Sequence, residues 1–396
     1  MSLASPEREA ISSIAARLIV SEIQISTVSS RRERDDFIKF PWTIYRNDPV
    51  WVPPLIIERR AFLNRKKHPF YLHGDAELFL ARRNGEIVGR IMASDDPRYN
   101  SLHRTNVGCF GLFECIDNQE VATALFAAAE EWLRARGRNE IMGPIDYSTN
   151  YVCGLLVDGF QHSPTLLTSH NPPYYRRLIE GYAFNKVIDF YAWSFSDPTQ
   201  ATIRLRKLKE RLQPRAQFTI RRANLRNLKA ESEQFVRIYN EAWKDNWGFV
   251  PFTQAEFDHL AAEMKPLLRA DFTGVAEVDG APIGFALALP DINVALQKIN
   301  GRLTTFGIPV GLAKLLYYKS RLKRARYIAM GVEPRFRRLG VAEMLVLAIM
   351  EEGMVKLHFD AELSMTLENN VMINRFIESI GATKYKTYRI YSKSLG

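Results

Sequence analysis

Hydrophobic and polar residues follow the same order twice along the chain. Residues 81–89 and residues 277–284 each read as an apolar strand, a tight turn with a central glycine and a second strand. The turn glycines, Gly85 and Gly280, lie 195 residues apart. Asn-Gly and Asp-Gly pairs between apolar runs are typical of two-residue hairpin turns, so we predict two β-hairpins in equivalent positions.

Other landmarks recur in the same order around these hairpins. Ile44-Tyr45 before the first hairpin is echoed by Ile238-Tyr239 before the second. Alanines and leucines fill one face of an expected helix over 121–136, and residues 341–356 are its counterpart. We interpret the pattern as a duplicated unit; the alternative is chance similarity between two amphipathic segments.

The length of the chain supports two domains. With 396 residues and 46% hydrophobic content the chain can build two cores, because single domains usually close at roughly 100 to 200 residues. Each half runs helix, hairpin, strand, long helix, strand, helix and final strand, which predicts an α/β fold. We expect an extension at 1–19, domains at 20–196 and 218–396, and a basic helical connector at 197–217.

Composition argues against several classes of protein. The three cysteines are an odd number without metal-ligand or redox spacing, so neither a secreted disulfide framework nor a metal site is expected. No apolar run reaches the ~18 residues of a membrane span, and no secretory leader pattern is present. A net charge of +10 attracts phosphorylated cofactors, anionic membranes or nucleic acid without choosing among them. We expect a soluble, cytoplasmic protein.

The strongest chemical signal is a basic loop between a strand and a helix. A β-rich run over 325–334 leads into Arg-Phe-Arg-Arg-Leu-Gly at 335–340 and then into an apolar helix. Amides at a helix start are unpaired and lie at the positive end of the helix dipole, and Gly340 has no Cβ to block a ligand. The loop predicts an anion site; a solvated helix cap is the alternative.

This loop resembles the pyrophosphate loop of the GNAT superfamily of acyl-CoA-dependent N-acyltransferases. The family pattern is Arg/Gln-x-x-Gly-x-Gly/Ala, and Arg-Arg-Leu-Gly-Val-Ala at 337–342 matches each defined position. The resemblance implies two tandem GNAT-like domains, each a mixed, mostly antiparallel sheet flanked by helices. It implies acyl-CoA as co-substrate, with no metal, its pantetheine arm along 330–332 and its pyrophosphate at 338–342. The implied cofactor-binding residues are Met330, Gly331, Val332, Arg337, Arg338, Leu339, Gly340, Val341, Ala342 and Asn370.

One family landmark is missing from this chain. The family tyrosine that protonates the departing thiolate corresponds to Ile377, which cannot donate a proton. Tyr385, Tyr388 and Tyr391 on the last expected strand are the nearest replacements. Strand alternation places Tyr388 on the opposite face from the other two. We favour Tyr388 as the acid, with purely structural tyrosines as the alternative.

Three carboxylates are candidates for the general base that an ammonium acceptor requires. Glu333, Glu362 and Asp291 lie at or near the ends of expected strands; solvated or structural carboxylates are the alternative. In GNAT folds the region around 243–251 forms the acceptor side of the cleft. The expected acceptor-binding residues are Asp245, Asn246, Trp247, Phe249 and Asp291.

The N-terminal half lacks the basic loop. Residues 111–120 enter the long helix with three carboxylates and no arginine, and carboxylates repel a pyrophosphate. We expect a degenerate GNAT-like domain that helps to shape the acceptor site.

An insertion at 293–324 separates the second hairpin from the cofactor strand. Leucines and tyrosines alternate there with lysines and arginines, as in helices that lie on anionic membranes or line a lipid path; a packed helix with a solvated basic face is the alternative. Together with residues 386–391, this layout resembles the GNAT-type bacterial ceramide synthases, which N-acylate a sphingoid base. That resemblance implies a long-chain lipid amine as acceptor and peripheral contact through 294–324 with the inner face of the membrane.

The combined expectation is transfer of an acyl group from acyl-CoA to an amine, either a small molecule or a lipid. A non-catalytic acyl-CoA-binding protein is the alternative, because the family tyrosine is missing. Nucleic-acid binding through the arginines of 204–226 ranks last, since no recognition motif accompanies them. We therefore expect no nucleic-acid partner.

Overall fold

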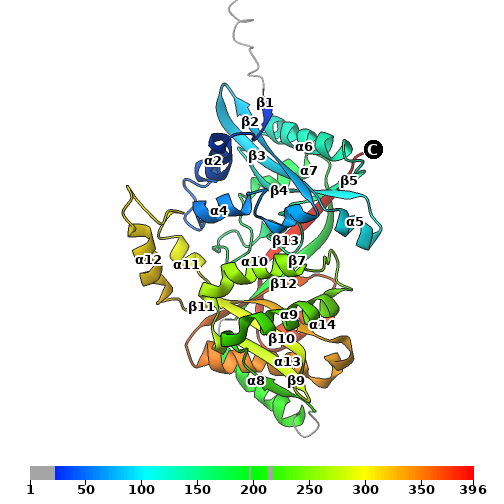
Figure 1. Ribbon diagram of the computed structural model, residues 1–396, viewed down its shortest axis with the longest axis vertical. Helices are drawn as coiled ribbons and strands as arrows, with labels where there is room; N and C mark the ends of the chain where they lie inside the picture. The colour runs from blue at the N-terminus through cyan, green and yellow to red at the C-terminus, as the bar shows by residue number, and fades with distance from the viewer. Residues whose placement is uncertain (1–22, 196–197, 213–216) are drawn as a thin grey trace, which may run out of the picture.

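The computed structural model describes residues 23–195, 198–212 and 217–396. Its main strands form one sheet that runs through both halves, with helices packed on its faces (Figure 1). The strand order is β1-β2-β3-β4-β5-β13-β7-β12-β11-β10-β9-β8, and β6 pairs with β13. The extension expected at 1–19 lies outside the described residues, as do residues 197 and 213–216 of the expected connector.

The N-terminal half alternates strands and helices as predicted. Its strands are β1 (Gln24–Thr27), β2 (Asp75–Arg83), β3 (Glu86–Asp95), β4 (Val107–Cys115), β5 (Glu140–Gly143), β6 (Leu155–Asp158) and β7 (Asn185–Phe195). Its helices are α2 (Arg31–Lys39), α3 (Pro41–Ile44), α4 (Ile56–Phe62), α5 (Pro97–His103), α6 (Gln119–Arg134) and α7 (Tyr174–Glu180), with a 3-10 helix at Pro69–Leu72.

The C-terminal half repeats this order after helix α8 (Pro198–Leu212). Its strands are β8 (Thr219–Arg221), β9 (Thr273–Val278), β10 (Ala281–Pro290), β11 (Arg324–Val332), β12 (Asp360–Leu367) and β13 (Thr383–Ser394). Its helices are α9 (Leu228–Trp243), α10 (Gln254–Met264), α11 (Asn293–Leu296), α12 (Val310–Lys319), α13 (Val341–Ile349) and α14 (Val371–Ser379). Short 3-10 helices span Leu225–Asn227, Lys265–Leu267, Ala270–Phe272 and Pro334–Leu339.

Both predicted hairpins are present, as β2–β3 and β9–β10. Their turns have positive φ at two successive residues, 53° and 80° at Asn84 and Gly85, and 50° and 78° at Asp279 and Gly280. Two left-handed residues match the twist of the flanking strands, and Asn, Asp and Gly adopt that conformation at low cost. The local sequence therefore determines both turns.

The last strand of each half pairs with the sheet of the other half. Strand β7 runs antiparallel to β12, with Ser194 opposite Glu362, and β13 runs antiparallel to β5, with Tyr391 opposite Gly143. Strands β7 and β13 also pair with each other at the centre of the sheet. A continuous hydrogen-bonded ladder therefore joins the two halves.

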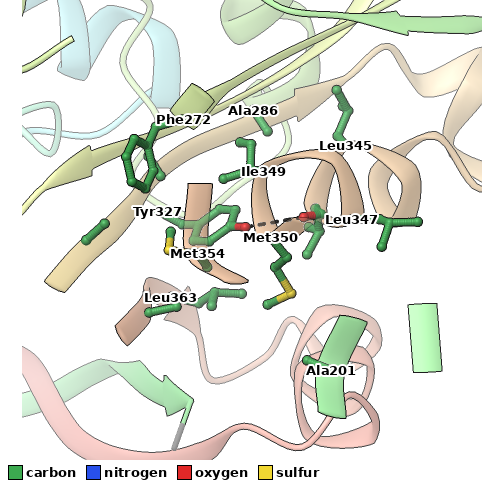
Figure 2. Close-up of a cluster of buried hydrophobic side chains, with 14 of the residues drawn as sticks. Ala201, Phe272, Ala286, Tyr327, Leu345, Leu347, Ile349, Met350, Met354 and Leu363 are labelled. Atoms are coloured by element: carbon green, nitrogen blue, oxygen red, sulfur yellow. Dashed lines mark hydrogen bonds between the residues drawn. The ribbon is translucent and has the colours of Figure 1, made fainter. Parts of the chain in front are cut away.

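Each half has a large apolar core against its side of the sheet. In the N-terminal half α6 packs on β2, β3 and β4, and α7 packs against α6 and β6. In the C-terminal half α13 packs on β9 and β10 with α8 beside it. Figure 2 shows part of this cluster, in which Tyr327 Oη donates to Val346 O at 3.3 Å.

The helix expected over 341–356 differs in detail: α13 ends at Ile349 and continues as a π-helix, Met350–Val355. The wider turn places the Gly353 backbone against Phe272.

Among the described residues, no helix has the length and apolar character needed to span a membrane.

Candidate functional site

Strands β11 and β12 run parallel at their start and then separate. Arg324 to Tyr327 pair with Asp360 to Leu363, and the pairing ends there. The other edge of β11 stays paired with β10 as far as Val332, with a bulge between Leu287 and Ala288 of β10. Residues 328–332 therefore have one edge without a strand partner.

Backbone groups of Met330 and Val332 point into the gap between the separated strands β11 and β12. Trp243 Nε1 donates to Met330 O at 3.0 Å and Arg337 Nε donates to Val332 O at 3.4 Å, so both carbonyls face away from β10. The N–H and C=O of one strand residue point to the same side, and the alternating amide, Glu333 N, donates to a β10 carbonyl at 2.9 Å. The gap thus offers the N–H groups of Met330 and Val332 as donors.

A left-handed glycine connects the end of β11 to helix α13. The 3-10 helix at 334–339 ends at Gly340, whose φ is 78°, and α13 begins at Val341 without a side-chain cap from the described residues. The first amides of a helix lack an intrahelical acceptor and lie at the positive end of its dipole. The turn therefore has the donors and the charge of an anion site, directly after the open strand edge.

The three arginines of this loop have different surroundings. Arg337 is fixed to the end of α9, where its Nη2 donates to Ala242 O at 2.5 Å. Arg335 is paired with Glu333 at 3.1 Å. Arg338 is exposed and has no hydrogen bond or ion pair with any residue that the structure describes. Arg338 is the loop cation that is available to an anionic ligand.

In the N-terminal half the equivalent gap is filled by the chain itself. Strand β4 pairs with β5 only over its first residues. Beyond them Leu112 N donates to Asp146 Oδ1 at 3.0 Å, and Cys115 N donates to Tyr175 Oη at 2.8 Å. The side chain of Asn118 caps α6. These β4 amides are equivalent to the β11 amides that face the gap in the C-terminal half. Because they have hydrogen-bond partners within the chain, they are not available to a ligand.

A buried ionic cluster lies just before β11 and β12 separate. Glu362 on β12 is 1% exposed. Its carboxylate accepts hydrogen bonds from four side chains, those of Thr165, Ser364, Arg324 and Tyr385. Burial raises its pKa, but Arg326, Arg324 and these hydrogen bonds outweigh burial and hold the pKa of Glu362 below its ordinary value. A carboxylate with this many donors stays ionised and is a weak base.

Two further titratable groups belong to the same cluster. Asp291, 1% exposed, accepts from Leu166 N at 2.9 Å, and burial raises its pKa to about 6. Lys386, also 1% exposed, donates to Ser163 O at 2.7 Å, and burial lowers its pKa to about 8. Both groups therefore titrate near neutral pH, as general acids and bases must.

Tyr388 lies in the apolar zone between the two halves. Its side chain is fully buried, and its Oη has no hydrogen-bond partner among the described residues. Trp247 and Met365 pack in the same cluster, and Met365 lies on β12 beyond the point of separation. Burial raises the pKa of Tyr388, and the nearby Thr168 side chain, which does not meet the geometry of a hydrogen bond, offsets this rise only in part, so the hydroxyl keeps its proton. A protonated hydroxyl without an acceptor thus lies in the cluster that borders the diverging part of β12.

The expectation that Tyr385 and Tyr388 lie on opposite faces of the last strand was wrong. Both contact the cluster between the halves, because the pairing of β13 with β7 shifts between Lys384 and Lys386. A bulge changes the alternation of side chains. Tyr391 does pack on the other face, in the core of the N-terminal half.

The structure distributes the remaining predicted carboxylates over different places. Glu333 follows β11 and accepts from Arg237 at 2.6 Å and Arg335 at 3.1 Å, so two cations neutralise it. Asp245 is exposed just after α9. Of the predicted acidic residues, Asp291 and Glu362 lie together in the buried ionic cluster described above.

Other predicted residues have mainly structural surroundings. Asn370 caps α14 by accepting from Ile373 N at 3.4 Å. Phe249 is buried beneath α9, and Asn246 is partly buried after the end of that helix. Ile377, which replaces the family tyrosine, is buried in the C-terminal core.

Sequence reasoning missed the contribution of residues 163–168 from the N-terminal half. Thr165 reaches Glu362, and the Leu166 carbonyl accepts from Arg326 on β11. Arg326 and Glu362 are charged residues within apolar strands, and that contrast was an available signal. No group of potential metal ligands occurs in the described part of the chain.

Lys386→Met is expected to raise the free energy of unfolding near neutral pH by about 1 to 3 kcal/mol. The folded-state pKa of Lys386 is about 8 and the ordinary value is 10.5, so burial of the charge opposes folding fully below the lower value. The unfolded chain binds more protons between the two values. The free energy of unfolding of the wild type therefore rises with pH as Lys386 loses its charge. The difference in free energy of unfolding between Lys386→Met and the wild type becomes smaller over the same range.

Urea unfolding at about pH 7 and about pH 9.5 measures this difference. Lys384→Met, at an exposed lysine on the same strand, is the control and is expected to show little change between the two pH values. An equal gain for Lys386→Met at both pH values would contradict the assigned burial of charge.

A family model and two relatives of known sequence match this chain. Residues 232–381 match the family model described as "Acetyltransferase (GNAT) family". The chain is 37% identical over 379 residues to Protein YghO of Escherichia coli (strain K12), covering 94% of this chain and 95% of that protein. It is 34% identical over 387 residues to the bacterial ceramide synthase of Caulobacter vibrioides (strain NA1000 / CB15N), covering 95% and 98%.

A solved structure supports the two-domain architecture. The tandem GNAT protein from the clavulanic acid biosynthesis pathway is 12% identical, with a TM-score of 0.56, and the match covers 95% of this chain and 99% of that chain. The predicted tandem fold is thus confirmed. Membership of this family implies N-acyltransferase activity on an amine with acyl-CoA as co-substrate. The chain belongs to the GNAT acyltransferase family, in its tandem two-domain form.

Proposed function

We propose that the C-terminal half binds acyl-CoA and transfers its acyl group to the amine of a long-chain lipid, such as a sphingoid base. The observation that carries the proposal is the open edge of β11, which leads directly into the uncapped start of α13. The N–H groups of Met330 and Val332 would bind the amide-rich pantetheine arm. The amides after Gly340, with Arg338, would bind the pyrophosphate.

The lipid acceptor is supported by two observations. The relative from Caulobacter vibrioides, 34% identical over nearly the whole chain, is a bacterial ceramide synthase. Large apolar side chains, including Trp247, Phe190 and Leu156, pack between the halves, as an acceptor with a long alkyl chain would require of its surroundings. We propose that the protein works in the cytoplasm and meets the inner face of the membrane through residues 294–324, because a long-chain amine resides in a bilayer.

In the proposed reaction the neutral amine attacks the thioester carbonyl and the C–N bond forms. The amine nitrogen gives up a proton to the base, the C–S bond breaks, and the thiolate takes a proton from the acid. We assign the proton donor to Tyr388, which is buried, protonated and without a partner among the described residues. Asp291 has a pKa raised to about 6 and is the better-matched base. Glu362, held ionised by its donors, and Glu333, paired with two arginines, are assigned supporting roles.

Release of free thiol tests the function. The full chain is mixed with acetyl-CoA or a long-chain acyl-CoA and with a panel of short amines and sphingoid bases. Thiol release that requires a long-chain amine, with an N-acylated product of matching mass, is expected. Binding of acyl-CoA without turnover on any amine would instead favour the non-catalytic acyl-CoA-binding alternative.

Tyr388→Phe is expected to lower kcat on the order of 100-fold, because it removes the proton donor to the thiolate. Stability is not expected to fall, since the substitution removes a buried hydroxyl that has no partner in the described structure. Steady-state kinetics and thermal unfolding measure the two effects.

Tyr391→Phe is the matched control on the same strand. It loses the hydrogen bond from Tyr391 Oη to Glu180 at 3.0 Å, and full activity is expected. A kcat for Tyr388→Phe within about twofold of wild type would exclude Tyr388 as the acid.

A further inference from the structure

The insertion between β10 and β11 carries charge of only one sign. From Ile292 to Val332 the sequence contains no aspartate or glutamate. The cations on or beside helix α12 are Lys314, Lys319, Arg321 and Lys323. A segment of this length without an acidic residue has a strongly positive potential.

The inner side of the insertion is fixed to the N-terminal half. Trp42 Nε1 donates to Asn300 Oδ1 at 2.7 Å, and Ile56 N donates to Gly301 O at 3.0 Å. Gln297 Nε2 donates to Pro49 O at 2.8 Å. Helices α11 and α12 project from the left side of the molecule in Figure 1. These three contacts anchor residues 297–301 of the insertion, just before α12, to the N-terminal half.

Apolar side chains project from that outer side. A tight turn closes with Thr305 opposite Ile308, with φ of 50° at Phe306 and 80° at Gly307. The Phe306 side chain at its tip is fully exposed, and Ile308 is 61% exposed. Further exposed apolar residues on α12 are Leu312, Leu316 and Tyr317. A soluble protein rarely exposes contiguous large apolar side chains without a partner for them.

A basic cavity of about 240 Å³ lies at the end of α12. Its lining includes Leu322 and Phe359, which are apolar, and Arg269, Lys319 and Lys323. Lys319 Nζ donates to Pro266 O at 2.6 Å and Lys323 Nζ to Leu357 O at 3.1 Å. Neither lysine has a carboxylate partner in the described residues, so the cavity combines an apolar wall with uncompensated positive charge.

We propose that the α12 surface, consisting of the exposed apolar residues 306–317 and this basic cavity, docks on an anionic phospholipid bilayer. Phe306 and the apolar residues of α12 insert at the level of the acyl chains, and Lys319 and Lys323 bind a lipid phosphate in the cavity. The combination of cations and exposed apolar side chains on or beside α12 favours a bilayer over a second copy of this chain, which is itself strongly basic. The purpose of this docking, which is delivery of a lipid amine to the site, rests on the proposed function.

Vesicle co-sedimentation of the full chain tests this docking without either substrate. Binding to phosphatidylcholine vesicles that contain about 30% phosphatidylglycerol is expected, with little binding to phosphatidylcholine alone and release at about 0.5 M salt. Phe306→Ser combined with Leu316→Ser is expected to weaken binding at least about tenfold. Lys319→Gln combined with Lys323→Gln is expected to do the same on anionic vesicles.

Leu72→Ser is the matched control, because Leu72 is an equally large apolar side chain that is 78% exposed but belongs to the 3-10 helix Pro69–Leu72 and not to the insertion. Its vesicle binding is expected to equal that of wild type. Absence of binding to anionic vesicles, equal binding by the double variants, or an α12-dependent dimer in solution would overturn the proposal. Thiol release with a sphingoid base presented in neutral detergent micelles, which requires no docking on an anionic bilayer, reports on the transferase separately, so failure of docking and failure of the proposed chemistry are distinguishable.

Discussion

The candidate site depends on backbone N–H groups that remain without a strand partner where β11 separates from β12. An unpaired amide away from solvent costs about 1 to 3 kcal/mol, so a fold rarely retains such groups unless water or a ligand satisfies them. Trp243 and Arg337 bond the carbonyls of Met330 and Val332, which fixes the strand while its amides stay available. The left-handed Gly340 then brings the first turn of α13 into line with this edge.

The two halves use the same divergence of strands for different purposes. In the N-terminal half Asp146 and Tyr175 accept hydrogen bonds from the Leu112 and Cys115 amides of β4, so these amides are not open to a ligand. It instead supplies Thr165 to the cluster around Glu362 and supplies β7 as the partner of β12. The N-terminal half thus has a structural role in the buried cluster of the C-terminal half.

The sequence predicted those features that depend on neighbouring residues. The hairpin turns follow from Asn84-Gly85 and Asp279-Gly280, and the loop before α13 follows from its arginines and Gly340. The exchange of β7 and β13 depends on pairing between distant segments, which periodicity does not specify. The bulge in β13 reversed the expected direction of Tyr385 for the same reason. The partner of Glu362 lies 197 residues away, so only the fold brings Thr165 to it.

Hydrogen–deuterium exchange with and without coenzyme A tests the central claim most directly. Slower exchange is predicted for the amides of Met330 and Val332 and for the first turn of α13 when coenzyme A is present. The equivalent stretch of the N-terminal half, from Leu112 to Val121, serves as an internal reference and is predicted to stay unchanged. Unaltered exchange at 330–343 in the presence of bound coenzyme A would contradict the account.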